Sequence, residues 1–161
     1  MVISTFSVPP NDRYFEDYPT GAIFELGSMS VTEEEIVEFA ERFDPQPFHT
    51  DSAAAHDTIY GGIIASGWHT GSIFMRLLVD GFLSSVAGMG SPGIDEIRWP
   101  VPVRGGDKLQ LRVTIVEARI SKSKPDRGIT KTLGELFNQN GEIVMSVRSN
   151  GFVGLRPQLT R

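Results

Sequence analysis

An aspartate and a histidine stand close together in the stretch FDPQPFHTD, which runs from Phe43 to Asp51 and contains two prolines. Proline fixes its own φ angle and restricts the residue before it, so the relative placement of Asp44 and His49 is constrained. A carboxylate beside an imidazole is a common means of holding and activating one water molecule near neutral pH. The alternative is a purely structural role, in which Asp-Pro forms a turn and the histidine is packed or solvated. The residues alone leave both interpretations open.

A second stretch, GGIIASGWHT from Gly61 to Thr70, has the composition of a helix start. Ser66 is a good N-cap residue, and the first turn of a helix presents free backbone N–H groups and a positive dipole end. Glycine at such a start lets a carbonyl oxygen approach, as an oxyanion hole requires. Many helices begin this way, and the glycines also allow close packing. Paired with the acid and histidine, the stretch favours chemistry on a carbonyl or thioester.

The other candidate side chains have simpler explanations. We expect Asp51 to cap a short helix through SAAAH, and His56 to be a solvated cation at its end. His69 falls on the polar edge of the next helix, where a structural role is expected. The run from Arg119 to Arg127 is the densest basic cluster, and it is either a solvated turn or a contact for nucleotide phosphates. No set of histidine, aspartate and glutamate has metal-ligand spacing, so we predict no metal.

Composition excludes several classes of protein. The 161 residues include no cysteine, which excludes disulfides, thiol nucleophiles and cysteine metal sites. The formal net charge is −5 and the basic residues are scattered, which argues against a nucleic-acid partner. No basic region followed by an apolar core is visible at the N-terminus, and the most apolar helix candidate, Ile73 to Leu83, is too short to span a bilayer. We therefore predict one soluble, cytoplasmic domain over residues 1–161, without a membrane partner.

The first half of the chain is predicted to contain a strand and two long helices. Residues 1–20 are polar and proline-containing, so we expect an irregular lead-in before a short strand over 22–29. Ser30 and Glu33 form a capping-box pattern, followed by apolar residues at helical spacing as far as Phe43. The second helix, from about Ser66 to Leu83, is apolar on nearly every face. We expect it to be buried on most sides.

The second half is predicted to surround that helix. Four segments resemble strands, over residues 94–103, 108–120, 129–138 and 142–155, and Asn140-Gly141 is a strong hairpin turn between the last two. Strand, helices and then a run of antiparallel strands is an α+β pattern. A curved antiparallel sheet around one central helix accounts for both halves.

Three motifs together resemble the MaoC-like dehydratase family, whose relatives include the (R)-specific enoyl-CoA hydratases. They are VTEEEI through FDPQPFHTD, then GGIIASGWHT, then SPGIDEIRWPVPVRGGDKL, and the likeness covers about residues 15–155. The resemblance implies a hot-dog fold, in which a long sheet wraps a central helix. It also implies that Asp44 and His49 are the catalytic dyad and that the backbone N–H of Gly67 polarises the thioester carbonyl.

The sequence departs from the family pattern near this site. Many hydratases of the family have histidine just before the oxyanion glycine, where this chain has Ser66. They also often carry a serine further along the central helix, where this chain has Met75, with Ser72 as a possible substitute. We predict that Ser66, Trp68, Ser72 and Met75 contact the substrate.

The resemblance implies hydration of a 2-enoyl-CoA, or the reverse dehydration of a 3-hydroxyacyl-CoA. No cofactor is expected, since coenzyme A is part of the substrate. The expected assembly is a homodimer, or a dimer of dimers or trimers, because the family's single hot-dog members pair edge to edge. Two alternatives stay open: an acyl-CoA thioesterase on the same fold, and a non-catalytic acyl-CoA or lipid-binding module.

Overall fold

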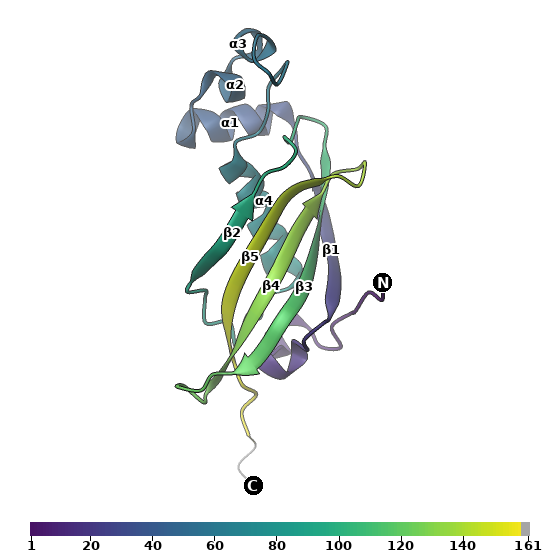
Figure 1. Cartoon of the computed structure of the whole chain (residues 1–161), viewed down its shortest axis with the longest axis vertical. Coiled ribbons are helices and arrows are strands. Elements are labelled where there is room, and N and C mark those ends of the chain that lie inside the picture. The colour runs from purple at the N-terminus through teal and green to yellow at the C-terminus, as the bar shows by residue number, and fades with distance from the viewer. Residues whose placement is uncertain (159–161) are drawn as a thin grey trace.

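The core of the protein is one five-stranded antiparallel sheet with a long helix against one face (Figure 1). A computed structural model describes residues 1–158. The strand order is β1-β3-β4-β5-β2 and every neighbouring pair is antiparallel. The strands are β1 (Ile23–Ser30), β2 (Gly93–Arg98), β3 (Lys108–Ile120), β4 (Arg127–Phe137) and β5 (Ile143–Gly154). The predicted α+β class is confirmed.

The helices form two groups. The long helix α4 (Gly67–Gly81) packs along the sheet, whereas α1 (Glu33–Phe43), α2 (Pro47–Thr50) and α3 (Ser52–His56) lie together beyond one end of it (Figure 1). The helix α2 was not predicted from the sequence. Among residues 1–158, none of the helices has both the length and the apolar character needed to cross a bilayer.

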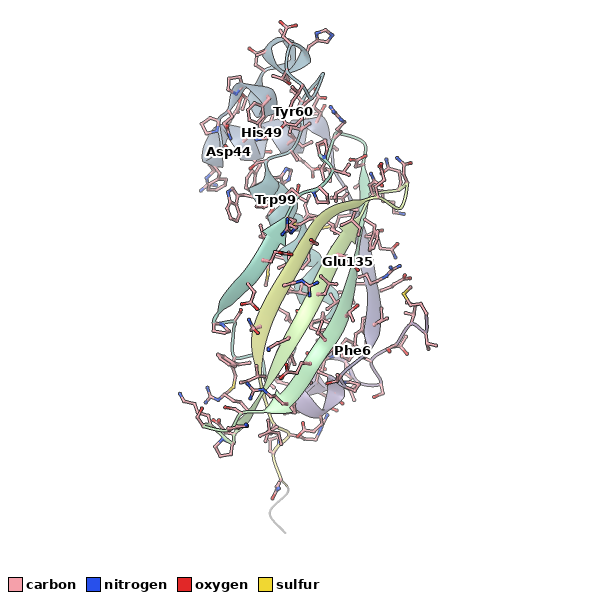
Figure 2. All side chains as sticks on the ribbon, viewed as in Figure 1. Phe6, Asp44, His49, Tyr60, Trp99 and Glu135 are labelled. Atoms are coloured by element: carbon pink, nitrogen blue, oxygen red, sulfur yellow. The ribbon has the colours of Figure 1, made fainter. Side chains whose placement is uncertain are left out.

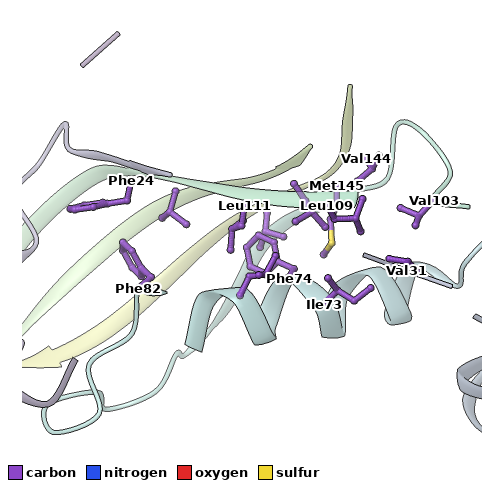
Figure 3. Close-up of a cluster of buried hydrophobic side chains, with 14 of the residues drawn as sticks. Phe24, Val31, Ile73, Phe74, Phe82, Val103, Leu109, Leu111, Val144 and Met145 are labelled. Atoms are coloured by element: carbon purple, nitrogen blue, oxygen red, sulfur yellow. The ribbon is translucent and has the colours of Figure 1, made fainter. Parts of the chain in front are cut away.

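Alternating residues of the long strands build the core between the sheet and α4. Leu109, Leu111, Val113 and Ile115 of β3 are all at most 1% exposed, which confirms the alternation seen in the sequence. Phe74 of α4 points into this layer (Figure 3). It meets β4 where that strand has Gly134, and a Cβ atom there would lie only 2.4 Å from the Phe74 ring. Glycine is therefore what allows the helix and sheet to approach so closely.

The predicted N-cap of α1 is wrong by two residues. Thr32, rather than Ser30, caps the helix, and it forms a reciprocal capping box with Glu35. Ser30 is unavailable because it ends β1, where it pairs with Lys108 of β3. The intervening Val31 is buried and hydrogen-bonds through its backbone to the turn before β3, so the helix starts only after it.

The prediction that α4 is buried on most sides needs correction. One face of it, formed by Trp68, Ser72, Met75 and Val79, is exposed, and we call this the open face of α4. Conversely His69, predicted on a polar edge, is only 8% exposed. The sheet covers one side of the helix. Within residues 1–158, Trp99 meets Trp68 at one end of the open face, and Ser72, Met75 and Val79 remain exposed.

The first 20 residues are irregular, as predicted, but they also pack against the core. They contain two short 3-10 turns, Pro10–Asp12 and Phe15–Asp17. Arg13 is buried and donates to the carbonyls of Gly81 and Phe82 at the C-terminal end of α4, with its guanidinium over the Phe6 ring. A cation at this end also suits the helix dipole. This segment therefore closes the end of the core opposite to α1, α2 and α3.

The later strands match their predicted positions except β2. It ends at Arg98 rather than at residue 103, because Pro100 and Pro102 lack the N–H that a ladder needs. The predicted turn between β4 and β5 is confirmed, with Gly141 at a φ of 77° and its N–H bonded to the carbonyl of Asn138.

Candidate active site

The dyad predicted from the sequence is brought together at the helical end of the molecule. Asp44 is the C-cap of α1, and its N–H still bonds to the carbonyl of Ala40. His49 lies in α2, a single turn that begins with Pro47. Figure 2 shows both side chains in this region, with Trp99 at the junction between the helices and the sheet. The two short elements thus fix the origins of both side chains.

Contacts at both ring nitrogens fix the orientation of the His49 ring. Nδ1 lies 2.7 Å from the carbonyl oxygen of Ile64, and Nε2 lies 3.3 Å from Oδ2 of Asp44. Because a backbone carbonyl can only accept, Nδ1 carries the proton and donates it. The lone pair of the neutral ring is then on Nε2, directed at the carboxylate. The His49 side chain is 5% exposed and that of Asp44 is 20% exposed, so solvent reaches the pair from the aspartate side.

The carboxylate of Asp44 accepts hydrogen bonds on both oxygens. Ser66 Oγ donates to Oδ2 at 2.7 Å, and Gln46 Nε2 donates to Oδ1 at 2.8 Å. The Ser66 bond and then the Gln46 bond hold the pKa of this carboxyl below its usual range, against the opposing effect of burial. Asp44 is therefore kept ionised, and in the neutral form of His49 two acceptors, Nε2 and Oδ2, face one another. A water molecule that donates to both would satisfy them.

The N-terminus of α4 lies directly beside this pair. Ser66 is the N-cap, since its Oγ accepts from the N–H of Trp68. The next N–H, that of Gly67, has no hydrogen-bond partner among residues 1–158. It is half-exposed at the positive end of a helix of 15 residues. A free donor here, one residue from the serine that bonds to Asp44, is a suitable oxyanion donor.

An indole ring packs beside Gly67. A Cβ atom on Gly67 would lie 2.7 Å from Cε2 of Trp99, with two more ring atoms at 3.0 and 3.1 Å. Trp99 follows β2 directly and meets Trp68 edge to face, with ring centroids 5.6 Å apart. The sequence interpretation missed Trp99 and also Gln46. A tryptophan just before Pro100 and a glutamine between Pro45 and Pro47 were the available signals, since each is held in a rigid segment.

The four residues predicted to contact substrate have different surroundings. Trp68 is 64% exposed and Met75 is 47% exposed, and both lie on the open face of α4. Ser72 lies on the same face, but its hydroxyl donates to the carbonyl of His69. Ser66 is fully buried and its hydroxyl is engaged by Asp44 and Trp68. The structure thus gives Ser66 a role toward the dyad, and the substrate contacts of all four stay predictions.

The remaining candidates lie outside the site. Asp51 caps α3 through bonds to two backbone N–H groups, and His56 ends that helix in an exposed position, as predicted. His69 stacks on Phe39 of α1, with ring centroids 4.8 Å apart, which supports the predicted structural role. Residues 119–127 form the connection from β3 to β4, at the opposite end of the sheet from the dyad (Figure 1). Within one chain the run therefore lies away from the dyad, and its contact with the phosphates of a coenzyme A nucleotide stays a prediction.

Neither a metal-binding cluster nor a hollow on the surface of the sheet offers an alternative site. Within residues 1–158, no group of three or more histidine, aspartate or glutamate side chains is placed to hold a metal ion. A surface hollow of about 610 Å³ lies over β1, β3 and β4, lined by residues that include Glu25, Lys108 and Arg112. Arg112 is already paired with Glu25 at 2.7 Å, and no histidine or free helix N-terminus lies there. The dyad and the start of α4 are the better candidate.

Comparison with known proteins gives the same family throughout. Residues 19–135 match the family model described as the MaoC like domain. YdeM of Bacillus subtilis, itself uncharacterized, is 32% identical over 126 residues, covering 77% of this chain and 86% of that protein. The 3-hydroxybutyryl-CoA dehydratase of Methylorubrum extorquens is 27% identical over 141 residues, covering 83% of each protein.

A solved structure extends the likeness to the whole fold. The crystal structure of the MaoC-like dehydratase from Rhodospirillum rubrum is 40% identical, with a TM-score of 0.85, and the match covers 91% of this chain and 99% of that one. The unliganded R-hydratase PhaJ1 from Pseudomonas aeruginosa, at 22% identity and a TM-score of 0.72, shares the fold. The predicted hot-dog fold is confirmed, and the chain belongs to the MaoC-like dehydratase family.

Proposed function

We propose that this protein is a hydro-lyase acting on acyl-CoA thioesters, which adds water to a 2-enoyl-CoA or removes it from a 3-hydroxyacyl-CoA. Membership of a dehydratase family supports the reaction class, and the relative named 3-hydroxybutyryl-CoA dehydratase supports the kind of substrate. The observation that carries the proposal is the pairing of His49 Nε2 with Asp44 Oδ2, 3.3 Å apart, beside the free N–H of Gly67. Water addition needs only proton transfers, so the proposal includes no cofactor besides the coenzyme A of the substrate.

In the proposed mechanism, the thioester oxygen accepts a hydrogen bond from the Gly67 N–H. This draws electron density from the double bond, so that C3 becomes electrophilic and the charge developing at C2 spreads onto the oxygen. One water molecule lies beside the pair, within hydrogen-bond reach of both His49 Nε2 and Asp44 Oδ2, and attacks C3 as it loses a proton. A proton then returns to C2. Dehydration follows the same steps in reverse.

The hydrogen bonds divide the roles within the dyad. Asp44 already accepts from Ser66 and Gln46, and its pKa is lowered, which makes it a weak base. His49 has its Nε2 lone pair free because Nδ1–H is used by the carbonyl of Ile64. We therefore assign proton abstraction to His49 Nε2, with Asp44 orienting the water and stabilising the imidazolium that forms.

The decisive experiment follows the carbon–carbon double bond and the thioester bond of the substrate. Purified protein is mixed with crotonyl-CoA and with longer and branched enoyl-CoAs, while the enoyl absorbance and free thiol are recorded together. Loss of absorbance without thiol release is expected. Thiol release with the double bond intact would instead identify a thioesterase, and binding without either change would identify a non-catalytic acyl-CoA module.

Variants then test the assignment of the site. We expect Asp44→Asn and His49→Ala each to lower kcat/KM by about 10²- to 10⁴-fold, the usual contribution of general acid–base catalysis. The matched control is His56→Ala, since His56 is an exposed histidine at the end of α3. It should retain full activity. Activity surviving in both dyad variants would refute the site.

We further propose that the protein works as a homodimer in which a second copy covers the open face of α4. Val79 and Met75 on this face are each 47% exposed, and the neighbouring β2 is an edge strand whose Ile94 is 55% exposed. Sedimentation velocity should show a dimer that Val79→Glu weakens. The control is Val116→Glu on β3, where the parent valine is 49% exposed, and this variant should sediment as the wild-type protein does. A monomeric wild-type protein would contradict the proposal.

A further inference from the structure

We propose that Ser66 is a positioning residue for the reaction, which locks the carboxylate of Asp44 to the N-terminus of α4. The inference rests on the proposed function, because it assigns Ser66 to the machinery of that same site. It differs from the substrate contact expected from the sequence. The structure places Ser66 where no solvent reaches it, with an exposed fraction of 0%.

The hydroxyl of Ser66 has one defined orientation. It has a single hydrogen, which it donates to Oδ2 of Asp44 at 2.7 Å, because an ionised carboxylate can only accept. Its lone pairs face the N–H of Trp68, which donates to Oγ at 3.3 Å. The same oxygen atom therefore caps α4 and holds a carboxylate that is 22 residues earlier in the chain.

The hydrogen bond from Ser66 is made to the same carboxylate oxygen of Asp44 that faces His49. Oδ2, which accepts from Ser66, is also the oxygen that lies 3.3 Å from His49 Nε2. Gln46 bonds to the other oxygen, Oδ1, and belongs to the same loop as Asp44. Among residues 1–158, the Ser66 bond is therefore the one hydrogen bond that ties the carboxylate to the helix that carries the Gly67 N–H. Without it, the carboxylate loses its direct link to α4, whereas His49 stays bonded to the carbonyl of Ile64, three residues before Gly67.

The other contact between α1 and α4 does not replace this bond. Phe39 of α1 stacks on His69 of α4, with an interplanar angle of 11°. That contact lies one turn before Asp44 and holds the helices together through ring faces. It leaves the rotation of the Asp44 side chain unrestricted. Placement to within a fraction of an ångström, which catalysis requires, then depends on the serine.

Three substitutions separate positioning from helix capping. Ser66→Gly and Ser66→Ala both remove the donor, but glycine at an N-cap lowers helix stability much less than alanine does. We expect both to lower kcat by about ten- to hundredfold, the usual effect of losing a hydrogen bond to a charged group, with KM changed less than about threefold. Ser66→Thr keeps the hydroxyl and should restore most of the activity. Ser66→Gly with wild-type kcat would overturn the proposal.

The pH profile gives a readout that a capping role would not move. His49 is the titratable group that faces Asp44, and its other partners, Ser66 and Gln46, are neutral donors. Loss of the Ser66 donor raises the pKa of Asp44, so the lowest-pH break in the acidic limb of kcat/KM, the one that reports protonation of Asp44, should shift to higher pH in Ser66→Gly. Thr32→Gly removes the N-cap of α1 instead, and it should leave that limb in place. An unchanged limb in Ser66→Gly would contradict the inference.

An NMR titration keeps the inference separate from the proposed reaction. The carboxyl carbon of Asp44 reports its pKa directly in wild-type protein and in Ser66→Gly, whether or not any enoyl-CoA is turned over. An upward shift in the variant supports the Ser66–Asp44 lock even if hydration is absent, in which case the proposed function alone fails. If the pKa of Asp44 is the same in both proteins, the lock itself is refuted.

Discussion

Replacement of Gly67 by alanine is the sharpest test of how the candidate site is packed. The new methyl would lie 2.7 Å from one ring atom of Trp99 and within 3.1 Å of two more, whereas ordinary carbon contacts begin near 3.4 Å. The ring must therefore move by several tenths of an ångström. Overpacking of this kind costs about 1–3 kcal/mol. Trp99 is 40% exposed, so it can move, but it would lose its edge contact with Trp68.

A smaller effect acts in the opposite direction. Gly67 does not have a positive φ, so alanine can adopt its backbone conformation. Replacing glycine at such a position stabilises a protein by about 0.4–1 kcal/mol, because the unfolded chain loses conformational freedom. We therefore expect Gly67→Ala to lower the free energy of unfolding by about 1–2 kcal/mol in the wild-type background.

The assay is a double-mutant cycle measured by urea denaturation. It compares wild-type protein, Gly67→Ala, Trp99→Ala and the double variant at one protein concentration, since the stability of a dimer depends on concentration. In the Trp99→Ala background the clash is absent, so Gly67→Ala should be neutral or slightly stabilising. The same loss in both backgrounds would refute the conclusion that Trp99 is what requires glycine at this position.

Three further substitutions test other parts of the fold by urea denaturation. Burial lowers the pKa of His69, so the unfolded state binds more protons below about pH 6.5; stability should fall as the pH drops through that range, and His69→Phe should reduce the slope. An unchanged slope would contradict this. Gly134→Ala places a methyl 2.4 Å from the Phe74 ring and should cost about 1–3 kcal/mol, a loss that an added Phe74→Leu should reduce. Thr32→Ala should lower the free energy of unfolding by about 1 kcal/mol, because it removes the cap of α1. An unchanged free energy of unfolding would favour Ser30 as the N-cap.

The sequence was informative about the fold where the signal is local. Alternation from Leu109 to Ile115 gave β3, and helical spacing gave α1, because both periods reflect which residues face the core. The start of α1 was less certain for a specific reason. Ser30 with Glu33 and Thr32 with Glu35 both satisfy the capping-box pattern. The choice depends on the pairing of Ser30 with β3, which is a contact across the sheet.

The exposed side of α4 shows another limit of sequence patterns. Apolar residues at nearly every position indicate that a helix is covered, but they do not say by what. The sheet covers Ile73, Phe74 and Leu77, whereas Trp68 and Met75 remain exposed in one chain. The composition of this helix therefore agrees with the proposal that a second copy covers its open face.

The candidate site combines residues that no short motif contains. Spacing predicted that Asp44 and His49 meet, but the carbonyl that sets the His49 tautomer belongs to Ile64, and the ring beside Gly67 belongs to Trp99. This affects how the glycine is interpreted. Because Trp99 occupies the space of a Cβ, packing alone requires glycine at position 67, and its presence does not by itself indicate an oxyanion hole. The stronger argument is the N–H of Gly67, which has no partner within residues 1–158 and lies next to a serine bonded to the carboxylate of Asp44.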